Sequence, residues 1–116
     1  MSTFSGIELE QQLIAGTWRT GSSQRSASDI NPYDDSVIAE IPLASAADVD
    51  EAYVAAQQAQ PKWAALAPAK RSAIMYRAAE LLEEKREEIV ELLIAESGST
   101  RDKANLEVTL AAGITR

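Results

Sequence analysis

Four glutamates crowd one short stretch of the chain, and carboxylates are groups that bind cations and carry out general acid–base chemistry. The run "LLEEKREEI" holds them, as Glu83, Glu84, Glu87 and Glu88. On a helix the second of these shares a face with the last two, so their oxygens could together hold a cation. Lys85 and Arg86 lie between the acids, which is typical of a solvated helical face of mixed charge. We therefore predict an exposed charged surface here and no metal site.

The segment "ESGSTRDK", from Glu96 to Lys103, combines hydroxyls with a glycine, and it could form a phosphate-binding loop, an active-site turn or a helix–helix corner. A phosphate loop of the G-x-x-x-x-G-K-[ST] type needs a second glycine and a lysine at that spacing, and both are missing. An anion at the start of the next helix would be repelled by Asp102 in its first turn. We predict a corner in which Gly98 ends one helix and Ser99 with Asp102 begins the next.

The hydroxyls of Ser97, Ser99 and Thr100 lack the base that a nucleophile needs, because the chain contains no histidine and offers no adjacent lysine at catalytic spacing. We predict that these hydroxyls cap helices. Cysteine is absent as well, so the 116 residues cannot supply a zinc-binding thiolate, a thiol nucleophile or a Ser-His-Asp triad.

Composition excludes several classes of partner. The net charge is −7, and Lys and Arg never gather into the basic stripe that nucleic acid or an anionic membrane surface requires. No apolar stretch approaches the length of a membrane span, and the amino terminus lacks the basic start and apolar run of a signal peptide. We therefore expect a cytoplasmic protein without nucleic-acid or membrane partners. The aromatic residues Trp18, Tyr53 and Trp63 could line a ligand pocket, but we expect such isolated aromatics to be packing anchors.

The first part of the chain has the short, turn-punctuated pattern of β-hairpins. Residues 1–12 have no clear period and are expected to form an arm or a frayed helix. The stretch "LIAGTWR" predicts two short strands around a turn at Ala15-Gly16. After a polar loop, "SDINPYDDSVIAEIP" predicts a second hairpin, with strands Asp29–Asn31 and Val37–Ile41 around a turn rich in proline and aspartate. The two hairpins occupy about residues 13–42.

From Ser45 onward the apolar period becomes helical, and we predict three to four helices over about residues 45–114. Ser45 and Asp48 form an S-x-x-D start signal for the first helix. Pro61 and Pro68 are expected to bracket a connection, and Pro68 suits the first position of the second helix because its missing N–H costs nothing there.

The apolar stripe of this second helical stretch lapses over Glu83–Glu88, so we predict a break near Lys85-Arg86. The last helix is predicted over Arg101–Ala112. Its candidate apolar face consists of Leu106, Thr109 and Leu110.

A series of stretches, in order, resembles the amino-terminal part of the aldehyde dehydrogenase superfamily: "IAGTW", "NPYDDSVIAEIP", "DVDEAYVAAQQAQPKW" and "PAKRSAIMYRAAELLEEKREEIVELLIAESG". The resemblance covers essentially the whole chain after Leu13. The chain departs from the family pattern at Ala15, where asparagine is usual, at Asp35-Ser36, where glycine is usual, and at Ser99, where lysine is usual. The stretch "ESGSTRDKANLE" resembles the subgroup that acts on aromatic aldehydes such as benzaldehyde and vanillin.

The resemblance implies an α/β parent fold with a Rossmann-type cofactor domain, in which residues 13–116 are the first, incomplete part of that domain. It also implies NAD(P)-dependent oxidation of an aldehyde to the carboxylic acid. In that reaction a cysteine thiolate attacks the aldehyde, a hydride passes to the nicotinamide, and a glutamate-activated water hydrolyses the thioester. The parent is expected to bind an aldehyde and either NAD or NADP, and to form a homodimer or homotetramer.

In the family the reacting groups lie further along the chain. The resemblance therefore implies no catalytic, cofactor-binding or metal-binding residue in this segment, and the 116-residue fragment alone is expected to be inactive. Some family members hold a structural monovalent cation, and the matching residues here are Asp29, Ile30 and Glu96. The alternative is a Glu96 that is simply exposed at a helix end, and we adopt this alternative.

Two rival interpretations stay open. The chain could be a small non-catalytic helical module that binds a partner through its alanine-rich faces. It could also belong to a family member with a degenerated active site, which would require a longer chain without the downstream cysteine.

Overall fold

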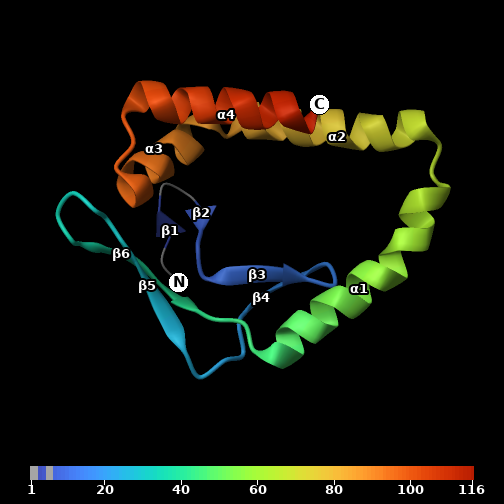
Figure 1. The fold of residues 1–116 in the computed structure, drawn as a ribbon, viewed down its shortest axis with the longest axis horizontal. Helices are drawn as coiled ribbons and strands as arrows, with labels where there is room; N and C mark the ends of the chain where they lie inside the picture. Colours follow the sequence, from blue (N-terminus) through green and yellow to red (C-terminus); the bar gives the residue numbers. More distant parts are fainter. Residues whose placement is uncertain (1–2, 5–6) are drawn as a thin grey trace. The chain divides into compact units, whose positions relative to one another are not determined.

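The computed structural model describes residues 3–4 and 7–116. The described residues divide into two compact units. Unit 1 comprises the chain up to Ile30 together with Ser36–Ala65, and unit 2 comprises Asn31–Asp35 together with Leu66–Arg116 (Figure 1). Within the described residues, no helix combines the length and the apolar character that crossing a membrane requires.

Unit 1 begins with two short antiparallel ladders. Strand β1 (Thr3–Phe4) pairs with β2 (Ile7–Glu8), and β3 (Gln11–Ile14) pairs with β4 (Thr17–Thr20). The alternative of a frayed helix is therefore wrong for the described residues before Leu13. A helix of that length is marginal in water, whereas strand pairing satisfies the backbone groups of both segments. The division of the chain into an arm at 1–12 and a domain part at 13–116 stays a prediction.

The turn between β3 and β4 confirms the predicted hairpin at Ala15-Gly16. Ala15 has φ 52° and Gly16 has φ 79°, so both central residues adopt the left-handed backbone that two-residue hairpins with the natural strand twist require. Glycine adopts this conformation without penalty, whereas an alanine there is strained. The strain at Ala15 gives a physical reason why asparagine, which tolerates this backbone better, is the usual family residue at this position.

The second predicted hairpin is also present. Strand β5 (Ser26–Ile30) pairs antiparallel with β6 (Val37–Pro42), and the register shifts between Asp29 and Ile30. Strand β5 begins three residues earlier than predicted and ends one residue earlier, and β6 extends one residue beyond the predicted Ile41, to Pro42. In the turn, the amide of Asp35 donates to the carbonyl of Asn31 at 2.9 Å.

Helix α1 (Ala46–Ala65) begins where the sequence predicts and ends later. Ser45 and Asp48 form a reciprocal capping box: the Asp48 amide donates to Ser45 Oγ at 3.2 Å, and the Ser45 amide donates to Asp48 Oδ2 at 2.8 Å. The predicted connection between Pro61 and Pro68 is wrong, because the helix continues through Pro61 to Ala65. A proline inside a helix forfeits one backbone hydrogen bond, and here that loss does not end the helix.

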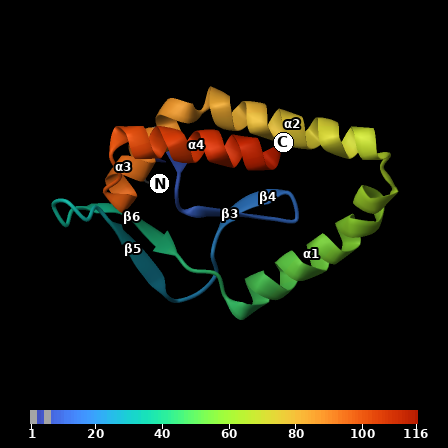
Figure 2. The same ribbon diagram turned by 45° about the horizontal axis from the view of Figure 1, so that its top comes forward.

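Unit 2 is built from three helices. They are α2 (Pro68–Glu84), α3 (Arg86–Ser97) and α4 (Arg101–Thr115), so the chain has four helices in all within its described residues. The predicted break falls at Lys85, with φ −95° and ψ 13°. Helix α4 lies alongside α2 and packs against α3 as well (Figures 1 and 2). Val90, Ala104 and Val108 form the buried cluster of this unit.

The predicted apolar face of α4 is wrong. Leu106 and Leu110 are more than half exposed, whereas Ala104, Val108 and Ala112 are buried. These three residues recur every fourth position and so lie on one side of the helix. Their small side chains allow the backbone of α4 to approach α2 and α3 closely, which larger leucines would prevent.

Arg86 joins the α2–α3 break to α4. Its guanidinium donates to the carbonyl of Asn105 at 2.9 Å, to Thr109 Oγ1 at 3.0 Å, and to Glu83 Oε2 at 2.5 Å. The side chain is only a quarter exposed, so these bonds are partly shielded from water. Arg86 thus fixes the position of α4 relative to the end of α2, a role that the charged pattern of "EEKREE" does not reveal.

We predict that Arg86→Met destabilises the fold by about 2 kcal/mol, because methionine keeps the packed stem and loses the charge-assisted hydrogen bonds. Urea unfolding followed by circular dichroism measures the change. The matched control is Arg77→Met, which removes an exposed arginine bonded to Glu80 and Glu84 on one helix surface, and which should change stability little. Equal effects of the two substitutions would contradict the role of Arg86.

A second prediction concerns two glycines that differ in their surroundings. A Cβ at Gly21 would lie 2.2 Å from the carbonyl oxygen of Leu43, so Gly21→Ala requires the backbone to move and should cost about 1–3 kcal/mol. A Cβ at Gly113, inside α4, would meet nothing within 4 Å. Gly113→Ala should therefore raise stability by up to about 1 kcal/mol. Thermal unfolding of both variants tests the contrast, and a Gly21→Ala variant as stable as the parent would refute it.

Candidate functional site

The four clustered glutamates are each held by a cationic side chain. Glu83 pairs with Arg86, and the remaining three pair as follows: Glu84 with Arg77 at 2.8 Å, Glu88 with Lys85 at 3.0 Å, and Glu87 with Arg101 at 3.4 Å. The hydrogen bonds that Arg77 donates to Glu84 and Glu80 raise its pKa above the usual value. Among the described residues, no group of three acidic side chains is placed to hold a metal ion. The arrangement is an ion-paired helix surface.

The segment "ESGSTRDK" is a corner between α3 and α4, as predicted. Gly98 ends α3 with φ 64° and ψ 23°, and its amide donates to the carbonyl of Ile94 at 3.1 Å. The predicted start signal at Ser99 is wrong by one residue. Thr100 has the extended backbone of an N-cap, and its Oγ1 accepts from the amide of Lys103 at 3.3 Å.

The hydroxyls at this corner have a basic neighbour that the sequence reasoning missed. Lys103 Nζ donates to Ser99 Oγ at 3.3 Å and to Glu107 Oε1 at 2.5 Å. The prediction that no adjacent lysine lies at catalytic spacing overlooked Lys103, four residues after Ser99. The short separation across the start of α4 was the available signal. Lys103 acts as the donor to Ser99 and is not its base. Ser97 Oγ donates to the carbonyl of Leu93 at 2.6 Å, so its role is structural.

The three aromatic residues are not packing anchors within these residues. Trp18 is 63% exposed on β4, and Tyr53 and Trp63 are 75% and 41% exposed on α1. None of the three lines either cavity described next. Their exposure makes them apolar surface rather than core or pocket.

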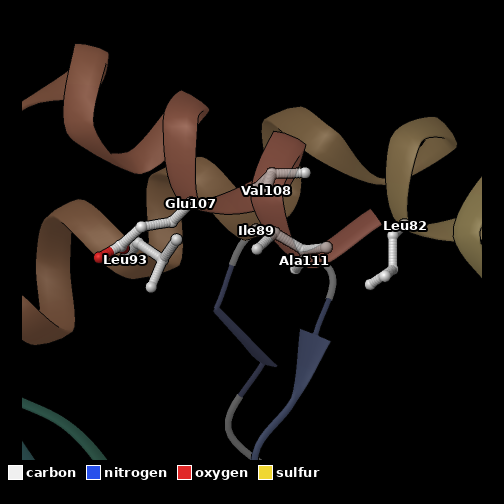
Figure 3. Close-up of a pocket in the computed structure, with 6 residues that line it drawn as sticks. All are labelled: Leu82, Ile89, Leu93, Glu107, Val108 and Ala111. Carbon is white, nitrogen blue, oxygen red and sulfur yellow. The ribbon is translucent and has the colours of Figure 1, made fainter. Parts of the chain in front are cut away.

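A cavity of about 260 Å³ opens between the helices of unit 2 (Figure 3). Its walls come from α2, α3 and α4, and its lining residues are Leu82, Ile89, Leu93, Glu107, Val108 and Ala111. The only ionisable group among them is the carboxylate that already pairs with Lys103. Such a surface can bind apolar groups through the hydrophobic effect, and it carries no acid–base or nucleophilic pair.

A more open cavity of about 400 Å³ lies in unit 1, between the β3–β4 turn and α1. Its lining is Ala15, Gly16, Ala55, Gln58, Ala59 and Lys62. One ammonium and one amide are its polar side chains, and neither has a partner group with which to perform catalysis. Neither cavity therefore constitutes an active site.

Among the acidic groups that the structure describes, the carboxylate of Asp48 has the pKa that departs most from its ordinary value. Its side chain is 3% exposed, and Oδ2 accepts hydrogen bonds from the amides and hydroxyls of both Ser22 and Ser45 at 2.8–3.1 Å. Oδ1 lies 3.2 Å from Arg19 Nη2. The backbone bond from Ser45, followed by the backbone and hydroxyl bonds from Ser22, holds the pKa of Asp48 far below its ordinary value. The role is structural: Asp48 ties the β4–β5 loop to the start of α1.

The three residues that match the cation site of some family members belong to different units. Asp29 and Ile30 lie in unit 1, on β5, and Glu96 lies in unit 2 on the last turn of α3, where its side chain is exposed. The adopted prediction, a Glu96 exposed at a helix end, is confirmed.

The comparisons with known proteins identify the family. The sequence profile of the aldehyde dehydrogenase family matches residues 18–116, so the chain belongs to this family. The resemblance inferred from the motifs is confirmed. The solved structures that match share the fold of hairpins followed by helices, so the predicted fold class is confirmed too.

Two curated relatives and one solved structure illustrate the relationship. The chain is 65% identical over 115 residues to a vanillin dehydrogenase from Corynebacterium glutamicum, covering 99% of this chain and 24% of that protein. It is 40% identical over 111 residues to a benzaldehyde dehydrogenase from Bacillus subtilis, covering 96% and 23%. The crystal structure of an NAD-dependent benzaldehyde dehydrogenase from Corynebacterium glutamicum matches with a TM-score of 0.92 and 66% identity, over 97% of this chain and 25% of that one. The chain thus spans about a quarter of the length of the relatives that it matches.

The depressed pKa of Asp48 predicts a specific pH dependence of stability. Because the pKa is lower in the folded than in the unfolded chain, the stabilisation is complete above the unfolded value of about 4 and decreases as the pH falls below it. We expect the melting temperature to fall between about pH 5 and pH 2, and Asp48→Asn to flatten this fall while lowering stability at pH 7. Asp50→Asn is the control, because it removes an exposed aspartate from the same helix turn. An unchanged pH profile in Asp48→Asn would contradict the prediction.

Proposed function

We propose that this chain is the amino-terminal part of an NAD-dependent aldehyde dehydrogenase that oxidises an aromatic aldehyde to the carboxylic acid. The observation that carries the proposal is the 65% identity to a vanillin dehydrogenase along nearly the whole chain. The match to a solved benzaldehyde dehydrogenase described as NAD-dependent supports the same substrate class and favours NAD over NADP. A malonate-semialdehyde dehydrogenase is only 30% identical, which favours an aromatic over a short aliphatic substrate.

The proposal requires the reacting groups to come from polypeptide outside these 116 residues. Aldehyde oxidation through a thioester needs a cysteine, and the chain has none. A nicotinamide dinucleotide does not fit the residues present. The unit 1 cavity offers one ammonium and one amide, the unit 2 cavity is almost wholly apolar, and a glycine-rich turn that could approach a pyrophosphate is missing from the sequence. The chain is therefore proposed to act as scaffold.

The surface of the described residues supports an origin in a longer protein. On α4 the small residues are buried while Leu106, Leu110 and Ile114 are 56%, 54% and 86% exposed. A helix of a self-contained globular module normally directs its large apolar residues inward. The cytoplasmic location of the parent and its homodimeric or homotetrameric state remain proposals that rest on the family relationship.

Steady-state kinetics test the activity. The protein encoded by the complete reading frame should form NADH with benzaldehyde and with vanillin, at a kcat/KM at least about tenfold above that with malonate semialdehyde, since a tenfold ratio needs only about 1.4 kcal/mol of differential transition-state binding. The 116-residue chain alone should form none. A preference for the aliphatic semialdehyde would refute the aromatic substrate class, and a longer protein inactive with every aldehyde would favour the degenerated family member.

Solution behaviour separates the proposal from the rival, a small non-catalytic interaction module. The isolated chain should self-associate at high concentration, because it exposes Tyr53, Trp18 and Ile114. Leu92 and Leu93 on α3 are partly buried, so they contribute less to this exposed apolar surface. Leu110→Glu, on the exposed face, should reduce the association seen in sedimentation, whereas Val108→Glu, in the core, should unfold unit 2. A chain that stays monodisperse at high concentration would favour the module.

A further inference from the structure

We draw no further inference here: the strongest candidate, the apolar cavity between α2, α3 and α4 lined by Leu82, Ile89, Leu93, Val108 and Ala111, is an unpartnered apolar surface, and nothing in the structure shows what covers it.

Discussion

The buried carboxylate of Asp48 is the interaction on which unit 1 depends. A charge with 3% exposure is tolerable only when hydrogen bonds replace the water that it has lost, and four donors from Ser22 and Ser45 do so with Arg19 close by. Those donors come from the loop after β4 and from Ser45, the residue that precedes α1. The Asp48 side chain therefore both caps the first turn of α1 and joins that helix to the loop after β4. The capping signal in the sequence reveals only the first of these two roles.

Unit 2 depends on a different constraint, which is close helix approach. Ala79, Ala104 and Ala112 are wholly buried, and the one large fully buried side chain among the described residues is Val90. A core of such small residues contributes little hydrophobic free energy per side chain. Its stability must rest partly on the polar bonds from Arg86 to α4, which hold the helices at the separation that the alanines permit.

Structural features that depend on a few neighbouring residues were predicted correctly from the sequence, whereas features that depend on tertiary contacts were not. The αL residue Gly98, the capping box at Ser45 and the break at Lys85 each depend on a few neighbouring residues, and all three were predicted. The buried face of α4 was not predicted correctly, because it depends on the helices that pack against α4 rather than on the apolar periodicity of α4 itself. The prediction of a helix end at Pro61 was wrong for a related reason. A proline removes one backbone hydrogen bond, but whether the helix continues past it depends on the rest of the helix and its contacts.

The candidate site also separates into features that the sequence alone determines and features that require the structure. The absence of cysteine and histidine is a property of composition, and it excludes thiol and imidazole chemistry by these residues without any coordinates. The proximity of Lys103 to Ser99 follows from their separation of only four residues across the start of α4. A basic group next to a hydroxyl can activate it only by accepting its proton, and here Lys103 donates instead. The chain can therefore be 65% identical to a vanillin dehydrogenase and still lack the cysteine and histidine side chains that such chemistry could use. A chain that spans about a quarter of its relatives' length can share their sequence through packing constraints alone, and it does not need to contain the reacting groups itself.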